Sequence, residues 1–185
     1  MFVATDKVYR FKRIGKIILK RRIRSMSTIT NTREYRASVI IYKEDLVDLI
    51  QMQDEMYKVI KNNEESSALV TIFSAASIAA KSVLKWNLAT GAAVLVNKMI
   101  ELVEKLGEQE KEMLENVVFE GKNIFYTASD YFEAHPTFEA IQVKLSFLEA
   151  TADTVWRAAI CDGEMENINT FTTEKILVNG IWLEP

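Results

Sequence analysis

The chain has 185 residues, of which 49% are hydrophobic and 26% are charged, a composition that argues against disorder over most of its length. Its single cysteine excludes a disulfide within the chain, and one cysteine with one histidine cannot build a zinc finger. The formal net charge of −3 combines two opposite parts. Residues 1–25 contain nine bases and one acid, whereas residues 26–185 contain 14 bases and 25 acids.

Residues 1–33 are predicted to form a basic arm followed by a polar linker. Phe11, Ile14 and Ile18 recur at helical spacing among the bases, which favours a basic amphipathic helix. The apolar run of the arm is too short for a secretory signal, so a cytoplasmic or membrane-peripheral location is expected. In an alternative that stays open, translation starts at Met26 and the residues before it have no function. The arm residues expected to bind an anionic partner are Arg10, Arg13, Lys16, Arg21, Arg22 and Arg24.

The remaining chain, residues 34–185, is predicted to form a single α+β domain that begins with one strand and a helical middle. Polar and apolar residues alternate over residues 34–42, as in a half-buried strand. Apolar residues then repeat at intervals of three and four over residues 44–118, which predicts about three helices. The expected boundaries are a stop at Asn62 and Asn63, a start at Ser66 and Ser67, and a third helix from Leu88 through Gly107 to Val117. Residues 120–136 are expected to form a short helix or an irregular turn.

Residues 138–185 are predicted to form a C-terminal antiparallel β-meander. Strands are expected from residue 138, over residues 154–161 and over residues 174–178, with a turn at Asp162 and Gly163. Asn179 and Gly180 predict the last hairpin, because both accept the positive φ that a two-residue turn needs. The pairing expected outward from this turn is Val178 with Ile181, Leu177 with Trp182, Ile176 with Leu183 and Lys175 with Glu184.

Residues 66–97 carry only two charges, Lys81 and Lys85. Neither of the apolar runs in this segment reaches the ~18–20 residues that cross a bilayer as a helix. Two interpretations remain: the segment is the core of an ordinary domain, or it is a hairpin that inserts into a membrane, as in pore-forming toxins. The residues expected to enter the membrane in the second interpretation are Ile72, Phe73, Trp86 and Val94.

The chain carries no catalytic signature. Gly91 and Gly107 stand singly, no phosphate-binding glycine motif occurs, and no cofactor is expected. His135 lies near Asp130 and Glu133, but their spacing matches no metal site, so no metal is predicted. Cys161 and His135 would form a nucleophilic pair only if the fold brought them together, and a lone cysteine is more often a buried apolar residue.

These features favour a non-catalytic binding or assembly protein, a class that includes small proteins of viruses and phages. Its basic arm would contact an anionic partner or the acidic body of a neighbouring subunit, and both contacts would weaken in salt. A membrane-active protein that inserts residues 66–97 is the first alternative, and an enzyme with a site near His135 is the second. An anionic membrane surface or nucleic acid could also receive the arm, but the arm carries no sequence-specific nucleic-acid signature.

Overall fold

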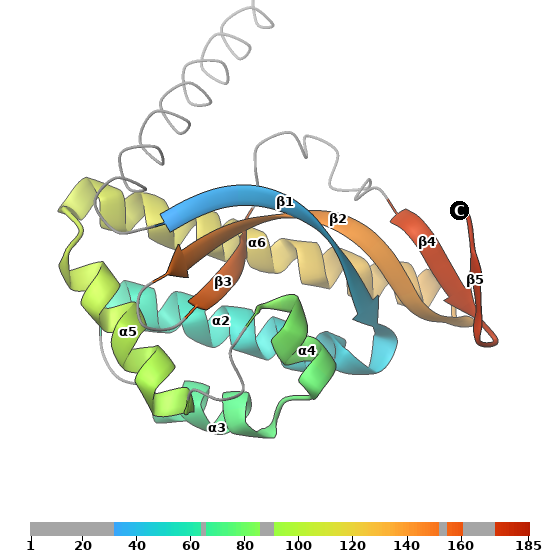
Figure 1. The fold of residues 1–185 in the computed structure, drawn as a ribbon, viewed down its shortest axis with the longest axis horizontal. Helices are drawn as coiled ribbons and strands as arrows, with labels where there is room; N and C mark the ends of the chain where they lie inside the picture. The colour runs from blue at the N-terminus through green and yellow to red at the C-terminus, as the bar shows by residue number, and fades with distance from the viewer. Residues whose placement is uncertain (1–31, 64–65, 86–90, 152–154, 161–172) are drawn as a thin grey trace, which may run out of the picture.

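The computed structural model describes residues 32–63, 66–85, 91–151, 155–160 and 173–185. These residues form a five-stranded antiparallel sheet and a set of helices (Figure 1), which confirms the α+β class. In chain order the elements are β1 (Thr32–Tyr42), the 3-10 helix η1 (Lys43–Asp45), α2 (Leu46–Asn62), α3 (Ser67–Ala75), α4 (Ile78–Val83), α5 (Ala92–Glu104), α6 (Glu108–Ala134), β2 (Phe138–Thr151), β3 (Val155–Ile160), β4 (Thr173–Val178) and β5 (Ile181–Leu183).

The long strand β2 organises the sheet. All of strand β1 pairs with β2, from Thr32 opposite Ala150 to Tyr42 opposite Ala140. On the other edge of β2, β3 pairs near its end and β4 near its beginning, and β5 then pairs with β4. The predicted meander order is therefore wrong, since β4 returns to β2 instead of pairing with β3. Strand β2 has 14 residues and β3 and β4 have six each, so both fit end to end along one edge.

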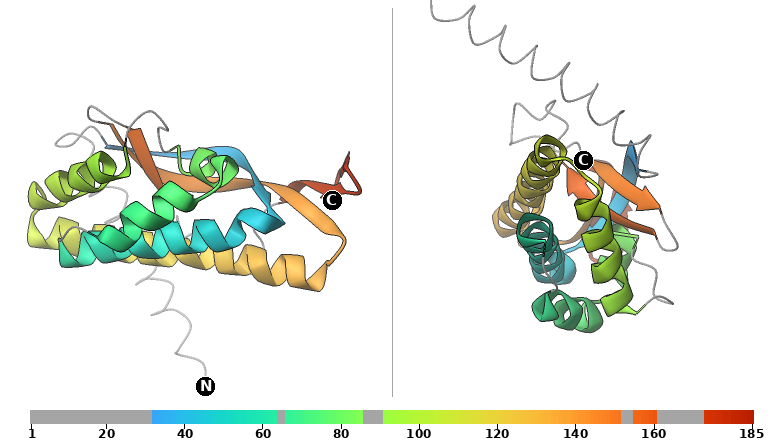
Figure 2. Two further views of the ribbon diagram at one scale, coloured as in Figure 1. Left: turned by 90° about the horizontal axis from the view of Figure 1, so that it is seen from below. Right: turned by 90° about the vertical axis from the view of Figure 1, so that its left-hand side faces the viewer.

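The core lies between the sheet and the helices, with α2 and α6 packed side by side (Figures 1 and 2). The inward residues of β1, Val39 and Ile41, face Val143 and Ile141 of β2, and all four are buried. Alternation along the strands thus puts one face of this ladder in the core. The core stripe of α2 is buried at three- and four-residue intervals; it consists of Leu49, Met52, Met56, Val59 and Ile60.

The described residues of the helical middle form five α-helices instead of about three. The helix predicted from Ser66 is interrupted at residues 76 and 77, where the Ser77 hydroxyl caps α4 by accepting from the backbone N–H of Ala80. The Asp48 carboxylate accepts from the backbone N–H of Ser77 and fixes this break against α2. The predicted stop at Asn62–Asn63 is confirmed, because Asn63 ends α2 in the left-handed conformation.

The third predicted helix is also two helices. The first of them, α5, ends at Glu104, and the second, α6, begins after Gly107. The backbone N–H of Gly107 donates to the Glu110 carboxylate. The expectation of a short helix or turn over residues 120–136 is wrong, because α6 continues without a break to Ala134. Its end before His135 and Pro136 agrees with the sequence, since a residue that precedes proline disfavours the helical conformation.

The β4–β5 hairpin has the predicted turn and stands at one end of the long axis (Figure 2). Asn179 and Gly180 have φ of 50° and 73°, and the three predicted apolar pairs are formed. The pairing ends there, before Lys175 and Glu184. The predicted turn at residues 162–163 lies outside the described residues.

Replacing Gly180 with valine is expected to destabilise this hairpin. A Cβ at Gly180 would meet nothing within 4 Å, so the cost is the backbone conformation alone, about 1–2 kcal/mol for an L-residue with positive φ. Thermal denaturation of G180V and of G91V gives the comparison, because Gly91 has equally open space and a φ of −61°. An unchanged melting temperature for G180V, together with unchanged amide exchange in β5, would contradict the prediction.

Candidate functional site

A buried carboxylate with three surrounding cations is the most unusual polar feature of the described residues. We call Arg33, Tyr35, Lys85, Glu149 and Arg157 the Glu149 cluster. The side chain of Glu149 is 3% exposed, and Arg157 is also 3% exposed as a residue. Charged residues are rarely buried so completely unless they are paired, so the partners of these two side chains define the site.

The register of the sheet assembles the Glu149 cluster. Glu149 on β2 lies directly opposite Arg33 on β1 and Arg157 on β3, so the three side chains form one row across three strands. Tyr35 lies in the next row on the same face, opposite Phe147. Lys85 is the residue that follows the C-cap of α4, and its φ of 51° is left-handed. Its side chain extends from there to Glu149.

The two carboxylate oxygens of Glu149 are engaged by separate donors. Nε of Arg33 donates to Oε1 at 2.7 Å, and a terminal guanidinium nitrogen of Arg33 contacts the same oxygen. The Tyr35 hydroxyl donates to Oε2 at 2.7 Å, and Nζ of Lys85 donates to it at 3.2 Å. One charged donor from β1, one from the end of α4 and the neutral hydroxyl of Tyr35 therefore compensate the desolvation of this carboxylate.

Arg157 links the cluster to the end of α4. Its Nε donates to the carbonyl of Val83 at 2.6 Å, and its backbone N–H donates to the carbonyl of Leu84 at 3.1 Å. A helix C-terminus favours a positive charge at this place. Another guanidinium nitrogen donates to the Tyr35 hydroxyl at 2.9 Å, and the guanidinium lies 3.8 Å from the centre of the Phe147 ring. Arg157 is thus fixed by carbonyls and rings, with Tyr35 between it and Glu149.

The environment holds Glu149 in its ionised form. Burial alone would raise its pKa, but the hydrogen bonds from Tyr35, Lys85 and Arg33 outweigh it and lower the pKa below the ordinary value of 4.5. A carboxylate whose pKa is lowered and that already accepts charged donors is a poor general base. The cluster has three cations and one anion, so it carries a net positive charge.

The predicted arm residues and Trp86 lie outside the described residues. The other members of the predicted membrane hairpin are separated by the fold: Phe73 is buried in the core, Ile72 is partly buried, and Val94 on α5 is exposed. The described part of residues 66–97 contains α3, α4 and the start of α5, so it is not a two-helix hairpin. Across the parts of the chain that the structure describes, none of the helices is both long enough and apolar enough to span a membrane.

His135 follows α6 and contacts Tyr131 and Phe138. Its Nδ1 lies 2.9 Å from the Tyr131 carbonyl, and its ring stacks on Phe138 with centroids 4.7 Å apart. An open hollow of about 690 Å³ lies nearby, lined by residues 42–44, residues 136–139 and Leu177, and His135 does not line it. Within the described ranges, no three His, Cys, Asp or Glu side chains gather to hold a metal ion. Cys161 lies outside these ranges, so whether the fold brings it to His135 is not tested.

Sequence analysis missed the Glu149 cluster, although a weak signal was present. Glu149 and Arg157 each interrupt a short apolar run, in FLEA and VWRAA. A charged residue inside an apolar strand needs a partner when it is buried. The partner could not be chosen from the sequence, because Arg33 lies 116 residues from Glu149 and meets it only through the β1–β2 register.

Comparison of the chain with family models, with curated proteins and with solved structures finds no match. The function is therefore inferred from the side chains and charges of the chain itself.

Proposed function

We propose that this protein is a non-catalytic assembly module whose basic residues 1–25 bind the acidic surface of a neighbouring copy. The opposite charge of the two parts of the chain carries this proposal: nine bases and one acid precede residue 26, and 25 acids and 14 bases follow. When one chain carries both a basic and an acidic patch, the basic patch of one copy attracts the acidic patch of the next. A second copy of the chain is therefore the partner in this proposal.

Helix α6 supplies the acceptor surface in this proposal. It contains seven acids and two bases, and most of the acids are exposed. Glu108, Glu112 and Glu115 follow one another at four and three residues, so they lie on one face of the helix. Glu101 and Glu104 extend the negative charge onto the end of α5.

The start of the described chain lies near this acidic region. Strand β1 begins at the same end of the long axis as the turn between α5 and α6, as both side-on views show (Figures 1 and 2). The 31 residues that precede Thr32 could extend over about 100 Å if fully stretched. Their length therefore allows a contact with an adjacent copy.

Charge reversal of Arg21, Arg22 and Arg24 to glutamate is expected to weaken self-association about tenfold or more. Each exposed ion pair contributes about 0.2–1 kcal/mol, and three reversals replace attraction with repulsion. Sedimentation of the full-length chain at low and high salt measures this change. Wild type is expected to associate at low salt and to dissociate in high salt, because salt screens exposed charges.

A matched control reverses three exposed lysines of the body, Lys61, Lys105 and Lys175. This variant has the same net charge as the arm variant, but it makes the proposed acceptor more acidic, so its association is expected to be kept or strengthened. A wild-type chain that is monomeric at both salt concentrations would overturn the proposal. Equal association of wild type and the arm variant would overturn it as well.

A further inference from the structure

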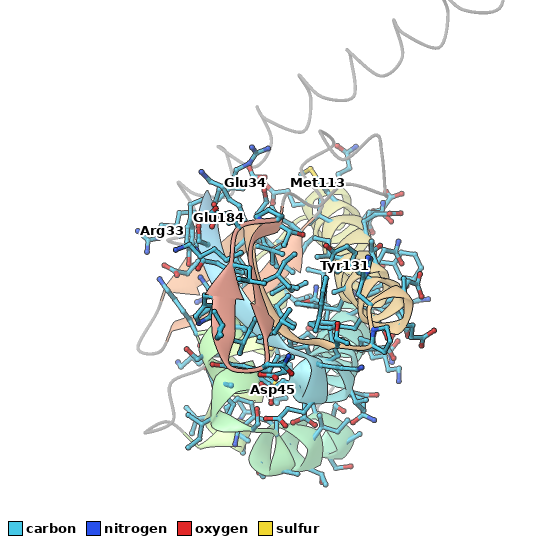
Figure 3. All side chains as sticks on the ribbon, turned by 90° about the vertical axis from the view of Figure 1, so that its right-hand side faces the viewer. Arg33, Glu34, Asp45, Met113, Tyr131 and Glu184 are labelled. Carbon is cyan, nitrogen blue, oxygen red and sulfur yellow. The ribbon has the colours of Figure 1, made fainter. Side chains whose placement is uncertain are left out.

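The Glu149 cluster presents two of its three cations to solvent. The side chain of Arg33 is 63% exposed and that of Lys85 is 44% exposed, whereas Glu149 and Arg157 are buried beneath them. Figure 3 shows Arg33 at the periphery of the molecule. The two most exposed side chains of the cluster are therefore basic, although its centre is a carboxylate.

Both exposed cations keep hydrogen-bonding capacity beyond Glu149. The contacts with Glu149 use two of the five N–H groups of Arg33 and one of the three of Lys85. Arg33 contacts Oε1 and Lys85 contacts Oε2, so one carboxylate spaces the two cations. An anion with several oxygens, such as phosphate, has the size to bridge two cations held this close together.

The position of Lys85 supports a role beyond ending α4. It is the residue after the C-cap, in the left-handed conformation that glycine adopts without strain. A lysine is disfavoured there, yet its side chain is directed to Glu149 and lies 5.1 Å from the centre of the Tyr35 ring. Arg33 lies 4.9 Å from the centre of the same ring. Tyr35 thus lies against both exposed cations and limits where they can move.

We propose that Arg33 and Lys85 form a binding site for a phosphate group, either inorganic phosphate or the phosphate monoester of a larger ligand. Glu149 acts as a positioning residue, because it holds the two cations at a fixed spacing without touching the ligand. Arg157 adds a buried positive charge behind them and offsets the repulsion that Glu149 would exert on an anion. This site is independent of residues 1–25 and of the assembly proposed above.

Thermal denaturation of the full-length chain in phosphate and in chloride at matched ionic strength tests the site. Millimolar phosphate is expected to raise the Tm of wild type by about 3–5 °C over chloride, as for a ligand present well above its Kd. Lys85→Met is expected to lose this excess. Lys98→Met is the matched control, because Lys98 forms a surface pair with Glu101 and its loss should leave the phosphate effect intact.

A second variant tests the positioning role of Glu149. Glu149→Gln removes the carboxylate that holds Arg33 and Lys85 at a fixed spacing, so phosphate is expected to raise its Tm by less than it raises that of wild type. Calorimetric titration of wild type with phosphate tests for binding without any variant. Titration with phosphatidate vesicles distinguishes a lipid headgroup from the free anion. Equal melting temperatures in phosphate and chloride with no heat of binding would overturn the site, as would an undiminished phosphate effect in Lys85→Met.

Discussion

Replacing Glu149 with glutamine is expected to lower the free energy of unfolding by about 3 kcal/mol, the usual cost of breaking a buried ion pair by removing one partner. Glutamine fills nearly the same space, so packing is retained and the lost charge is isolated. Its amide nitrogen would meet donors from Arg33, Tyr35 or Lys85 where the carboxylate accepted them. The Tyr35 hydroxyl, which accepts from the buried Arg157, would then lose its own acceptor.

Urea denaturation measures this loss against a surface control. Glu101→Gln also removes one carboxylate from an ion pair, with Lys98, but that side chain is 48% exposed and the expected cost is about 0.5 kcal/mol or less. A Glu149→Gln variant as stable as Glu101→Gln would show that the cluster contributes no more than a surface pair.

The acid sensitivity of folding should change in the same variant. Because the pKa of Glu149 is lowered in the folded protein, the unfolded chain takes up the proton first as the pH falls. The stability that Glu149 contributes is therefore fully present above its unfolded pKa and is lost as the pH falls through its folded pKa. Burial raises the pKa of Asp54, but Lys122 and Lys58 lower it overall, so Glu149→Gln should retain part of the acid sensitivity. An unchanged dependence on pH below about 4.5 would contradict this role of Glu149.

The strands that could be predicted from the sequence are those whose evidence is local. Alternation over residues 34–42 and from residue 138, and the turn at Asn179–Gly180, each depend on neighbouring residues alone. The order of the strands depends on which part of one edge of β2 each short strand occupies, and β3 packs there on α6 and α2, which are distant in sequence. For the same reason the Glu149 cluster could not be predicted, since it joins three strands and the end of α4.

The helix boundaries that were missed depend on tertiary contacts. The break before α4 is held by the Asp48 carboxylate from another helix, which no local pattern reveals. The start of α6 has a local signal, because Glu110 lies three residues after Gly107 and accepts its backbone N–H. That signal resembles a capping box but has glycine in place of serine or threonine, so the sequence alone predicts one continuous helix through Gly107.

Replacing Gly121 with alanine is expected to destabilise the fold by at least about 4 kcal/mol or to prevent folding, the range reserved for severe core disruption. Helix propensity alone predicts the opposite sign, because alanine in a helix interior is more favourable than glycine by about 1 kcal/mol. The contact of Gly121 with β3 decides whether the steric clash or the helix propensity is the larger effect. A Cβ at Gly121 would lie 1.8 Å from the carbonyl oxygen of Ala159 and 2.5 Å from its carbonyl carbon.

The atoms that would clash with this Cβ cannot move aside cheaply, because they belong to a strand edge that α2 and α6 close. The Gln53 amide donates to the carbonyls of Ala159 and Val118 at 2.9 Å and accepts from the backbone N–H of Ala159. This buried side chain thus pairs with β3 as a neighbouring strand would, and it also lies 3.1 Å from the position of the new Cβ. Moving α6 outward would break these hydrogen bonds and leave buried polar groups unpaired, at about 1–3 kcal/mol each.

Gly91→Ala is the matched control, because a Cβ there meets nothing within 4 Å and its φ of −61° suits any residue. Its expected change is within about 0.5 kcal/mol, as at an open surface site. Circular dichroism and thermal melting of both variants separate the two effects. If Gly121→Ala melted at or above the temperature of wild type, helix propensity would outweigh the contact with β3, and the close approach of α6 to this edge would be refuted. If Gly121→Ala fails to fold and Gly91→Ala folds, the absence of a Cβ at Gly121 is what allows α6 to pack against β3 at the edge of the sheet.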